Sequence, residues 1–149
     1  MKRTKLKDRV LPDYTRGEEL MNTLTHGAGA VLGVAALVLC VLTAASHRNV
    51  WGVVGSVIYG VAMIALYCVS SVYHGMKPGM AKKVMQVIDH CAIYFLIAGT
   101  YTPILLGAFL PVYPGIAWGL LALQWTLCIT AAVMASVHTK PSNPQASTG

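Results

Sequence analysis

The sequence predicts an all-α integral membrane protein with four transmembrane helices and a cytoplasmic amino end. Three observations support this fold class. Of the 149 residues, 56% are hydrophobic and 11% are charged, whereas about a quarter of a soluble domain is charged. The charges also cluster, because six of the eleven Lys and Arg residues precede residue 17. Finally, residues 90–139 contain no Asp, Glu, Lys or Arg, so this part of the chain must face lipid.

The first two transmembrane helices are expected near residues 27–46 and 52–73. Each lies within an uncharged run longer than the roughly 20 residues that a helix needs to cross a hydrocarbon core. Ahead of the first span, Thr15 and Glu18 have the spacing of a capping box. A helix is therefore predicted to begin at that point, before the membrane.

The third and fourth spans share the long uncharged run and are expected near residues 90–110 and 115–137. The sequence Leu-Pro-Val-Tyr-Pro-Gly at residues 110–115 is typical of a turn, and it divides the run into two crossings. Four crossings place both ends of the chain on one side of the membrane.

Two features of these spans predict how helices pack. Gly29 and Gly33 have the four-residue spacing that allows two helices to approach closely. Pro103 removes a helical hydrogen bond from the carbonyl four residues before it and should kink the third span. The hydroxyls of Thr100 and Thr102 are expected to satisfy that carbonyl.

The Lys and Arg counts predict the orientation. The amino end holds six Lys and Arg residues, and the loop around Arg48 holds one. The loop after the second span holds three, the next turn holds none and the tail holds one. Because cytoplasmic segments carry the excess, residues 1–14 are expected to form a basic cytoplasmic amino end. A nucleic-acid patch is the alternative for such a segment, but it does not explain the alternation. No cleavable secretory signal is expected, because the first hydrophobic run starts late and is too long.

Polar residues from separate spans are expected to meet at the cytoplasmic side. Glu19, Asn22 and His26 share one helix face, although an interfacial amphipathic turn would show the same spacing. Ser70 and His74 stand one turn apart at the end of the second span, where a lone histidine is most often interfacial.

Asp89 opens the third span from the same side, so it is expected at the depth of these residues. An Asp at the bilayer centre costs about 2.5–3.5 kcal/mol and usually faces a polar cavity. A helix cap near water remains the simpler alternative for Asp89.

Histidine nitrogen together with carboxylate oxygen suits zinc, and an acid can hold a metal-bound water. A catalytic zinc site generally has three protein ligands. His74 is the leading candidate, while His26 and His138 lie at about the right depth and His47 lies on the opposite side. The four cysteines fall one per span with no close pair, which argues against a disulfide framework or a CxxC site.

Three motifs resemble those of the bacterial hemolysin III family, within the wider progestin and adipoQ (PAQR) receptor group. The resemblance covers residues 15–137 and is most specific in the third motif. The motifs are Glu19-x-x-Asn22-x-x-Thr25-His26, Ser70-x-x-x-His74, and Asp89-His90-x-x-Ile93-Tyr94-x-Leu96-Ile97-Ala98-Gly99-Thr100-Tyr101-Thr102-Pro103.

The resemblance implies a seven-helix bundle with a zinc site in the inner leaflet. It makes His74 a zinc ligand and places Asp89 and Ser70 in the catalytic centre, with Asp89 holding the zinc-bound water. The polar cluster of Glu19, Asn22 and His26 supports that centre. The family's other two zinc histidines come from an H-x-x-x-H motif in the seventh span, which this chain lacks. We therefore expect a truncated member or a fragment with an incomplete metal site, and residues 138–149 do not look like family sequence.

Two functions follow from the resemblance. The first is a multi-pass protein of the bacterial inner membrane in membrane homeostasis or cytolysis, without catalysis of its own. The alternative is a zinc-dependent hydrolase of a lipid amide or ester, similar to a ceramidase and not expected to be active in this truncated form. Membrane lipids and a helix–helix oligomer are the expected partners, and nucleic acid is not. A ligand-sensing receptor is the weakest reading.

Overall fold

The structure is a computed structural model that describes residues 6–137, and all of its regular elements there are helical. It confirms an all-α chain with four helices long and apolar enough to cross a membrane. These elements are η1 (Leu6–Asp8), α1 (Arg16–Ser46), α2 (Val50–Gly75), α3 (Met80–Ile104), the π-helical turn η2 (Leu105–Phe109) and α4 (Pro114–Val137).

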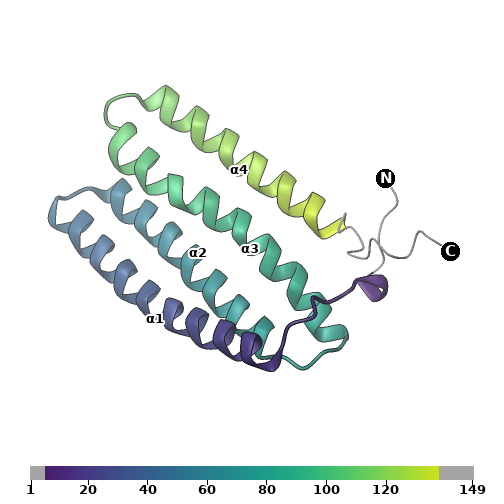
Figure 1. Cartoon of the computed structure of the whole chain (residues 1–149). Coiled ribbons are helices and arrows are strands. Elements are labelled where there is room, and N and C mark those ends of the chain that lie inside the picture. The colour runs from purple at the N-terminus through teal and green to yellow at the C-terminus, as the bar shows by residue number, and fades with distance from the viewer. Residues whose placement is uncertain (1–5, 138–149) are drawn as a thin grey trace.

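The four long helices form an open layer rather than a closed bundle. Among the described residues, α1 packs closely against α2, α2 against α3, and α3 against α4. Figure 1 shows α1 and α4 at opposite edges of this layer. Large apolar side chains cover the exposed faces, for example Leu32 at 70% and Leu39 at 65% exposure. Such faces suit a lipid environment.

The contact between α1 and α2 depends on the glycine pair. A Cβ atom on Gly29 would lie 2.8 Å from the ring of Tyr67, and one on Gly33 would lie 3.2 Å from Ile64. The expected close packing therefore occurs within the chain, between successive helices. The predicted capping box is also present, since Thr15 and Glu18 bond reciprocally at the start of α1.

The third helix begins earlier than expected. Residue 90 was the expected start of the span, whereas α3 starts at Met80 with Gly79 as its N-cap. The loop that follows α2 is therefore short, and Lys82 and Lys83 belong to the first turn of a helix. This difference matters because it brings a lysine side chain into the protein interior.

The region around Pro103 differs from the expectation in one respect. The helix passes into the π-helical turn η2 directly after Pro103, and Leu110 N–H donates to the Leu105 carbonyl across five residues. The Thr100 and Thr102 hydroxyls donate to the carbonyls of Leu96 and Ala98. The expectation that they satisfy the Gly99 carbonyl was wrong, because a helical threonine reaches the carbonyl four residues before its own position.

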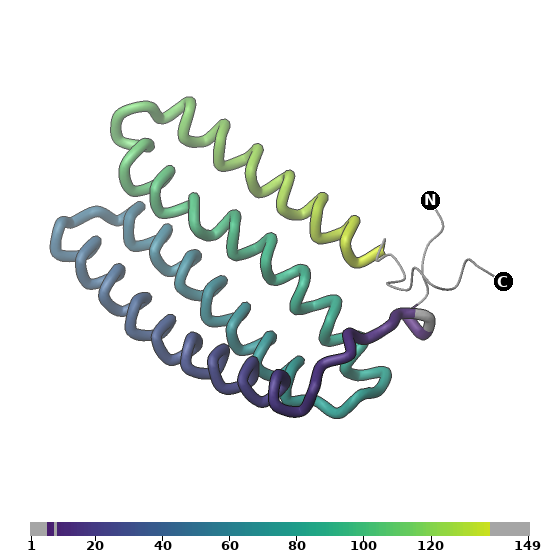
Figure 2. Tube along the Cα trace, viewed as in Figure 1, coloured from purple at the N-terminus to yellow at the C-terminus, as the bar shows by residue number. Residues whose placement is uncertain are grey.

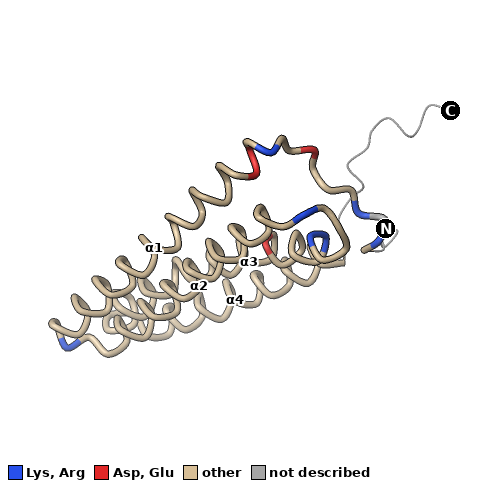
Figure 3. Tube along the Cα trace, turned by 90° about the horizontal axis from the view of Figure 1, so that it is seen from below, with Lys and Arg blue, Asp and Glu red and all other residues tan. Residues whose placement is uncertain are grey.

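The charges gather at one end of the layer, which we call the charged end. It comprises the start of α1, the end of α2, the start of α3 and the end of α4 (Figure 3). Arg48 belongs to the loop between α1 and α2, at the opposite end. The amino-terminal segment runs along this end from α1 toward α4 (Figure 2). Arg9, which is 6% exposed, donates from Nη2 to the Ser136 carbonyl at 2.8 Å. Its guanidinium thereby satisfies a carbonyl at the end of α4.

Candidate polar site at the charged end

One carboxylate joins three helices at the charged end. Glu19 of α1 contacts His74 Nδ1 of α2 through Oε2 at 2.7 Å. It also accepts a hydrogen bond from Lys82 Nζ of α3 through Oε1 at 2.5 Å. The Lys82 ammonium donates to the Met76 carbonyl as well, at 3.0 Å. We call Glu19, His74 and Lys82 the ionic cluster.

The ionic cluster is largely shielded from water. The side chains of His74 and Lys82 are 9% and 4% exposed, and that of Glu19 is 20% exposed. Removing an ammonium from water is costly unless a partner compensates. Glu19 supplies that partner, so the position of Lys82 depends on the carboxylate.

Aromatic rings enclose the cluster. The ring of Tyr73 lies 4.8 Å from that of His74, and Lys82 Nζ lies 5.3 Å from the Tyr73 ring centroid. The rings of Tyr14 and His74 form a T-shaped contact with their centroids 5.6 Å apart. A cation over an aromatic face is attracted to it. Tyr73, which is 3% exposed, therefore stabilises the Lys82 ammonium and also packs against the His74 ring.

The residues of the polar face predicted on α1 have two different roles. Glu19 makes the contacts between helices described above. His26 stacks on His74 with ring centroids 5.8 Å apart, and its Nδ1 bonds the Asn22 carbonyl at 2.7 Å. Asn22 thus takes part through its main chain, since its side chain forms no hydrogen bond among the described residues.

Ser70 and Asp89 lie near the cluster without joining it. Ser70 is 5% exposed and stands one turn before His74 on α2. Its neighbour Ser71 makes the contact between helices, donating to the Thr23 carbonyl at 2.9 Å. Asp89 is half-buried on α3 and lies within electrostatic reach of the Tyr73 phenol. Within residues 6–137 it forms no ion pair or hydrogen bond.

The residues described do not by themselves suit a zinc ion. In the range 6–137, no three His, Cys, Asp or Glu side chains gather as a metal site requires. One ring nitrogen of His74 is already engaged by Glu19, which leaves Nε2. His138, the other candidate named from the sequence, lies outside the described residues. A zinc ion at His74 would need ligands from beyond this range.

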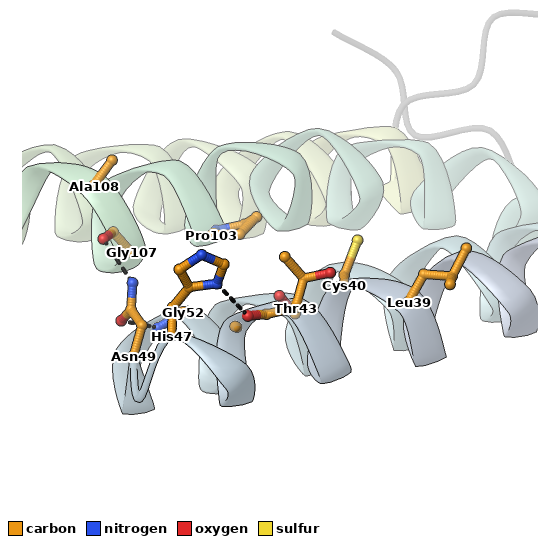
Figure 4. A pocket seen from close by; sticks show the side chains of 11 residues that line it. Leu39, Cys40, Thr43, His47, Asn49, Gly52, Pro103, Gly107 and Ala108 are labelled. Atoms are coloured by element: carbon orange, nitrogen blue, oxygen red, sulfur yellow. Dashed lines mark hydrogen bonds between the residues drawn. The ribbon is translucent and has the colours of Figure 1, made fainter.

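A second polar site occupies the opposite end and surrounds a cavity of about 500 Å³. His47 and Asn49 border it together with Pro103 and Gly107 (Figure 4). Asn49 accepts from Gly52 N–H at 2.8 Å and donates to the Gly107 carbonyl at 3.0 Å. These bonds tie the start of α2 to the π-helical turn, so their role is structural.

Sequence reasoning missed Lys82 and Tyr73. The sequence predicts a later start for the third helix, and Lys82 then falls in a loop. One signal was present: Lys82 and Asp89 are seven residues apart, a spacing that places both on one face of a continuous helix. A third missed group lies in the span, where Trp125 Nε1 donates to the Thr102 hydroxyl at 3.2 Å.

Comparison with known proteins identifies relatives of this chain. A family model described as haemolysin-III related matches residues 14–147. The chain is 40% identical over 120 residues to "Hemolysin-3 homolog" of Bacillus subtilis (strain 168), covering 80% of this chain and 55% of that protein. It is 42% identical over 112 residues to "Hemolysin-3" of Bacillus cereus, covering 75% of this chain and 50% of that protein.

The chain is also similar, more distantly, to animal proteins. The chain is 33% identical over 93 residues to "Monocyte to macrophage differentiation factor" of Homo sapiens, covering 58% of this chain and 37% of that protein. No solved structure gives a significant match. The chain spans about half the length of the bacterial relatives that it matches.

Proposed function

This chain belongs to the haemolysin-III-related family, and we propose that it serves membrane homeostasis in a bacterial inner membrane, with the ionic cluster as its functional centre. The four helices make it a multi-pass membrane protein. The observation that carries the proposal is the Glu19 carboxylate shared by His74 and Lys82 across three helices. Ionisable side chains in membrane proteins are costly, and they usually mark functional sites.

The charge distribution supports a cytoplasmic position for the charged end. Arg48 is the one Lys or Arg at the opposite end among the described residues. Basic residues accumulate on the cytoplasmic side of membrane proteins. In this orientation the ionic cluster lies in the inner leaflet.

The proposal is tested by complementation. A bacterium lacking the gene receives the wild-type chain or Glu19→Gln, and dye entry is measured under ethanol stress at equal protein abundance in the membrane. We expect the wild type to restore the barrier and Glu19→Gln to fail. Glu18→Gln is the matched control, because Glu18 bonds only Thr15 at the start of α1. An unchanged barrier after gene deletion, or full rescue by Glu19→Gln, contradicts the proposal.

Cytolysis is the other function that the names of the bacterial relatives suggest. It predicts that purified chain added to erythrocytes releases haemoglobin in proportion to its concentration. The same preparation inactivated by heat is the control. If no haemoglobin is released at concentrations at which the chain inserts into vesicles, the chain has no cytolytic activity in this assay.

A specific contact favours a second candidate, a zinc-dependent hydrolase of a lipid amide or ester. A carboxylate commonly orients the far ring nitrogen of a metal-binding histidine, and Glu19 contacts His74 in this manner at Nδ1. The additional ligands would have to come from outside the described residues. This candidate predicts near-stoichiometric zinc in the purified chain and its loss in His74→Ala. Zinc-free wild-type protein would exclude the candidate for this chain.

A further inference from the structure

A cavity of about 760 Å³ lies beside the ionic cluster at the charged end. The start of α1, the end of α2, the short loop before α3 and the first turn of α3 line it. Its volume falls within the 300–1,000 Å³ typical of sites for small ligands. The polar side chains that line it include Tyr14, Arg16, Glu19, His74, Lys77 and Lys82.

The cavity wall carries an excess of positive charge. Both oxygens of Glu19 are already occupied by His74 and Lys82, so the carboxylate neutralises the buried lysine. Arg16 and Lys77 are exposed, and they form no ion pair with any side chain that the structure describes. Among those side chains, the two cationic groups therefore line the cavity without an anionic partner. A planar guanidinium and an ammonium that line the same cavity suit a phosphate group, which the arginine can bind with two hydrogen bonds.

An apolar surface begins at the edge of the cavity. Leu20 lines the cavity and is 58% exposed. Leu24 follows one turn further along α1 and is 59% exposed. A ligand whose phosphate lies between Arg16 and Lys77 could therefore extend apolar chains along α1. This arrangement matches a phospholipid better than free phosphate.

We propose that this cavity binds the headgroup of an anionic phospholipid, with Arg16 and Lys77 recognising its phosphate. The inference rests on the proposed function in one respect, since it places the charged end at the cytoplasmic leaflet, where anionic lipids are attracted to basic residues. Basic pockets between transmembrane helices on that side are typical headgroup sites. The shielded ionic cluster and the two exposed cations, Arg16 and Lys77, all line this cavity.

Native mass spectrometry of the full chain in detergent tests the proposal. The probes are phosphatidylglycerol, the zwitterionic phosphatidylcholine, and inorganic phosphate as a competitor. We expect phosphatidylglycerol to bind at least tenfold more tightly than phosphatidylcholine. Arg16→Gln with Lys77→Gln should weaken phosphatidylglycerol binding about thirtyfold, at roughly fivefold for each basic residue. Arg48→Gln removes a positive charge from the opposite end and should leave binding unchanged.

The proposal is overturned if the two lipids bind equally, if the double variant retains the preference, or if Arg48→Gln causes an equal loss. Displacement of the lipid by equimolar phosphate would show that the site binds free phosphate rather than a lipid headgroup. Circular dichroism is used to check that the double variant is folded. We expect it to fold, because both substituted side chains are exposed. Detergent has no sidedness, so failure of this assay tells against the headgroup site, whereas failure of the complementation assay tells against the proposed function.

Discussion

Glu19 and His74 lie 55 positions apart in the chain, yet their side chains meet at 2.7 Å. The contact joins the first turn of α1 to the last turn of α2. Lys82 then adds α3 to the same carboxylate. Three of the four long helices are thus connected through one acidic side chain at the charged end.

We expect Glu19→Gln to destabilise the chain, because it leaves the Lys82 ammonium buried without an anion. Removing one partner of a fully buried pair costs roughly 3–5 kcal/mol, and the partial exposure of Glu19 should reduce this to about 2–3 kcal/mol. The measurement is unfolding in mild detergent followed by circular dichroism. Glu18→Gln should destabilise the chain much less, because Glu18 is exposed and bonds only Thr15 at the start of α1. Equal losses in the two variants would show that the ionic cluster contributes no specific stability.

Gly55→Ala should destabilise the packing of α2 on α3. A Cβ atom at this position would lie 2.5 Å from the Pro103 Cα atom, which cannot rotate away as a side chain can. Overpacking of this kind typically costs about 1–3 kcal/mol. Gly119→Ala is the matched control, since nothing lies within 4 Å of its added Cβ, and it should be neutral or stabilising. A neutral Gly55→Ala would indicate that the two helices separate easily.

Thr102→Val should loosen the contact between α3 and α4. Thr102 is 1% exposed, and its hydroxyl accepts a hydrogen bond from Trp125. Valine keeps the shape and leaves the indole N–H without this partner, at a cost of about 0.6–1.7 kcal/mol in a membrane protein. Unfolding and indole fluorescence would both report the change. Thr102→Ser should restore the hydrogen bond, whereas Thr100→Val should have little effect because Thr100 is exposed and bonds only within its own helix. Similar losses in both valine variants would contradict this assignment.

Arg9→Ala should release the amino-terminal segment from the charged end. Arg9 is the residue that bonds this segment to the Ser136 carbonyl of α4. We expect faster tryptic cleavage after Lys7 in the variant, measured by mass spectrometry on protein reconstituted in vesicles. Lys83→Gln tests the second attachment, because Lys83 Nζ donates to the Lys7 carbonyl. Unchanged cleavage in the Arg9 variant would mean that its hydrogen bond does not hold the segment.

The orientation is tested with two reporters. Green fluorescent protein fused after Gly149 should fluoresce, because that end is proposed to face the cytoplasm. Alkaline phosphatase inserted after Arg48 should be active, because that loop is proposed to face outward. The reverse pattern would overturn the orientation on which the proposed function depends.

The number and type of helices could be predicted from composition and uncharged runs, because a chain in lipid must satisfy its backbone polar groups internally. The residue at which each helix starts was harder to predict than the number of helices. The capping box at Thr15 indicated the start of α1, but α3 begins after Gly79 without a side-chain cap. The charged residues in this segment are typical of a loop. The sequence therefore predicts an exposed Lys82, whereas the structure buries it in the first turn of α3.

Residue type and spacing were enough to predict an all-α membrane protein and to select Glu19, Ser70, His74 and Asp89 as candidate site residues. Which of these side chains touch could be learned only from the packed helices. Glu19 meets His74 and Lys82, while Ser70 and Asp89 remain outside these contacts. The reason is physical: the rotation and axial offset of each helix are set by packing contacts such as Gly29 on Tyr67 and Gly55 on Pro103. Such contacts join residues far apart in the chain, so no local pattern reveals them.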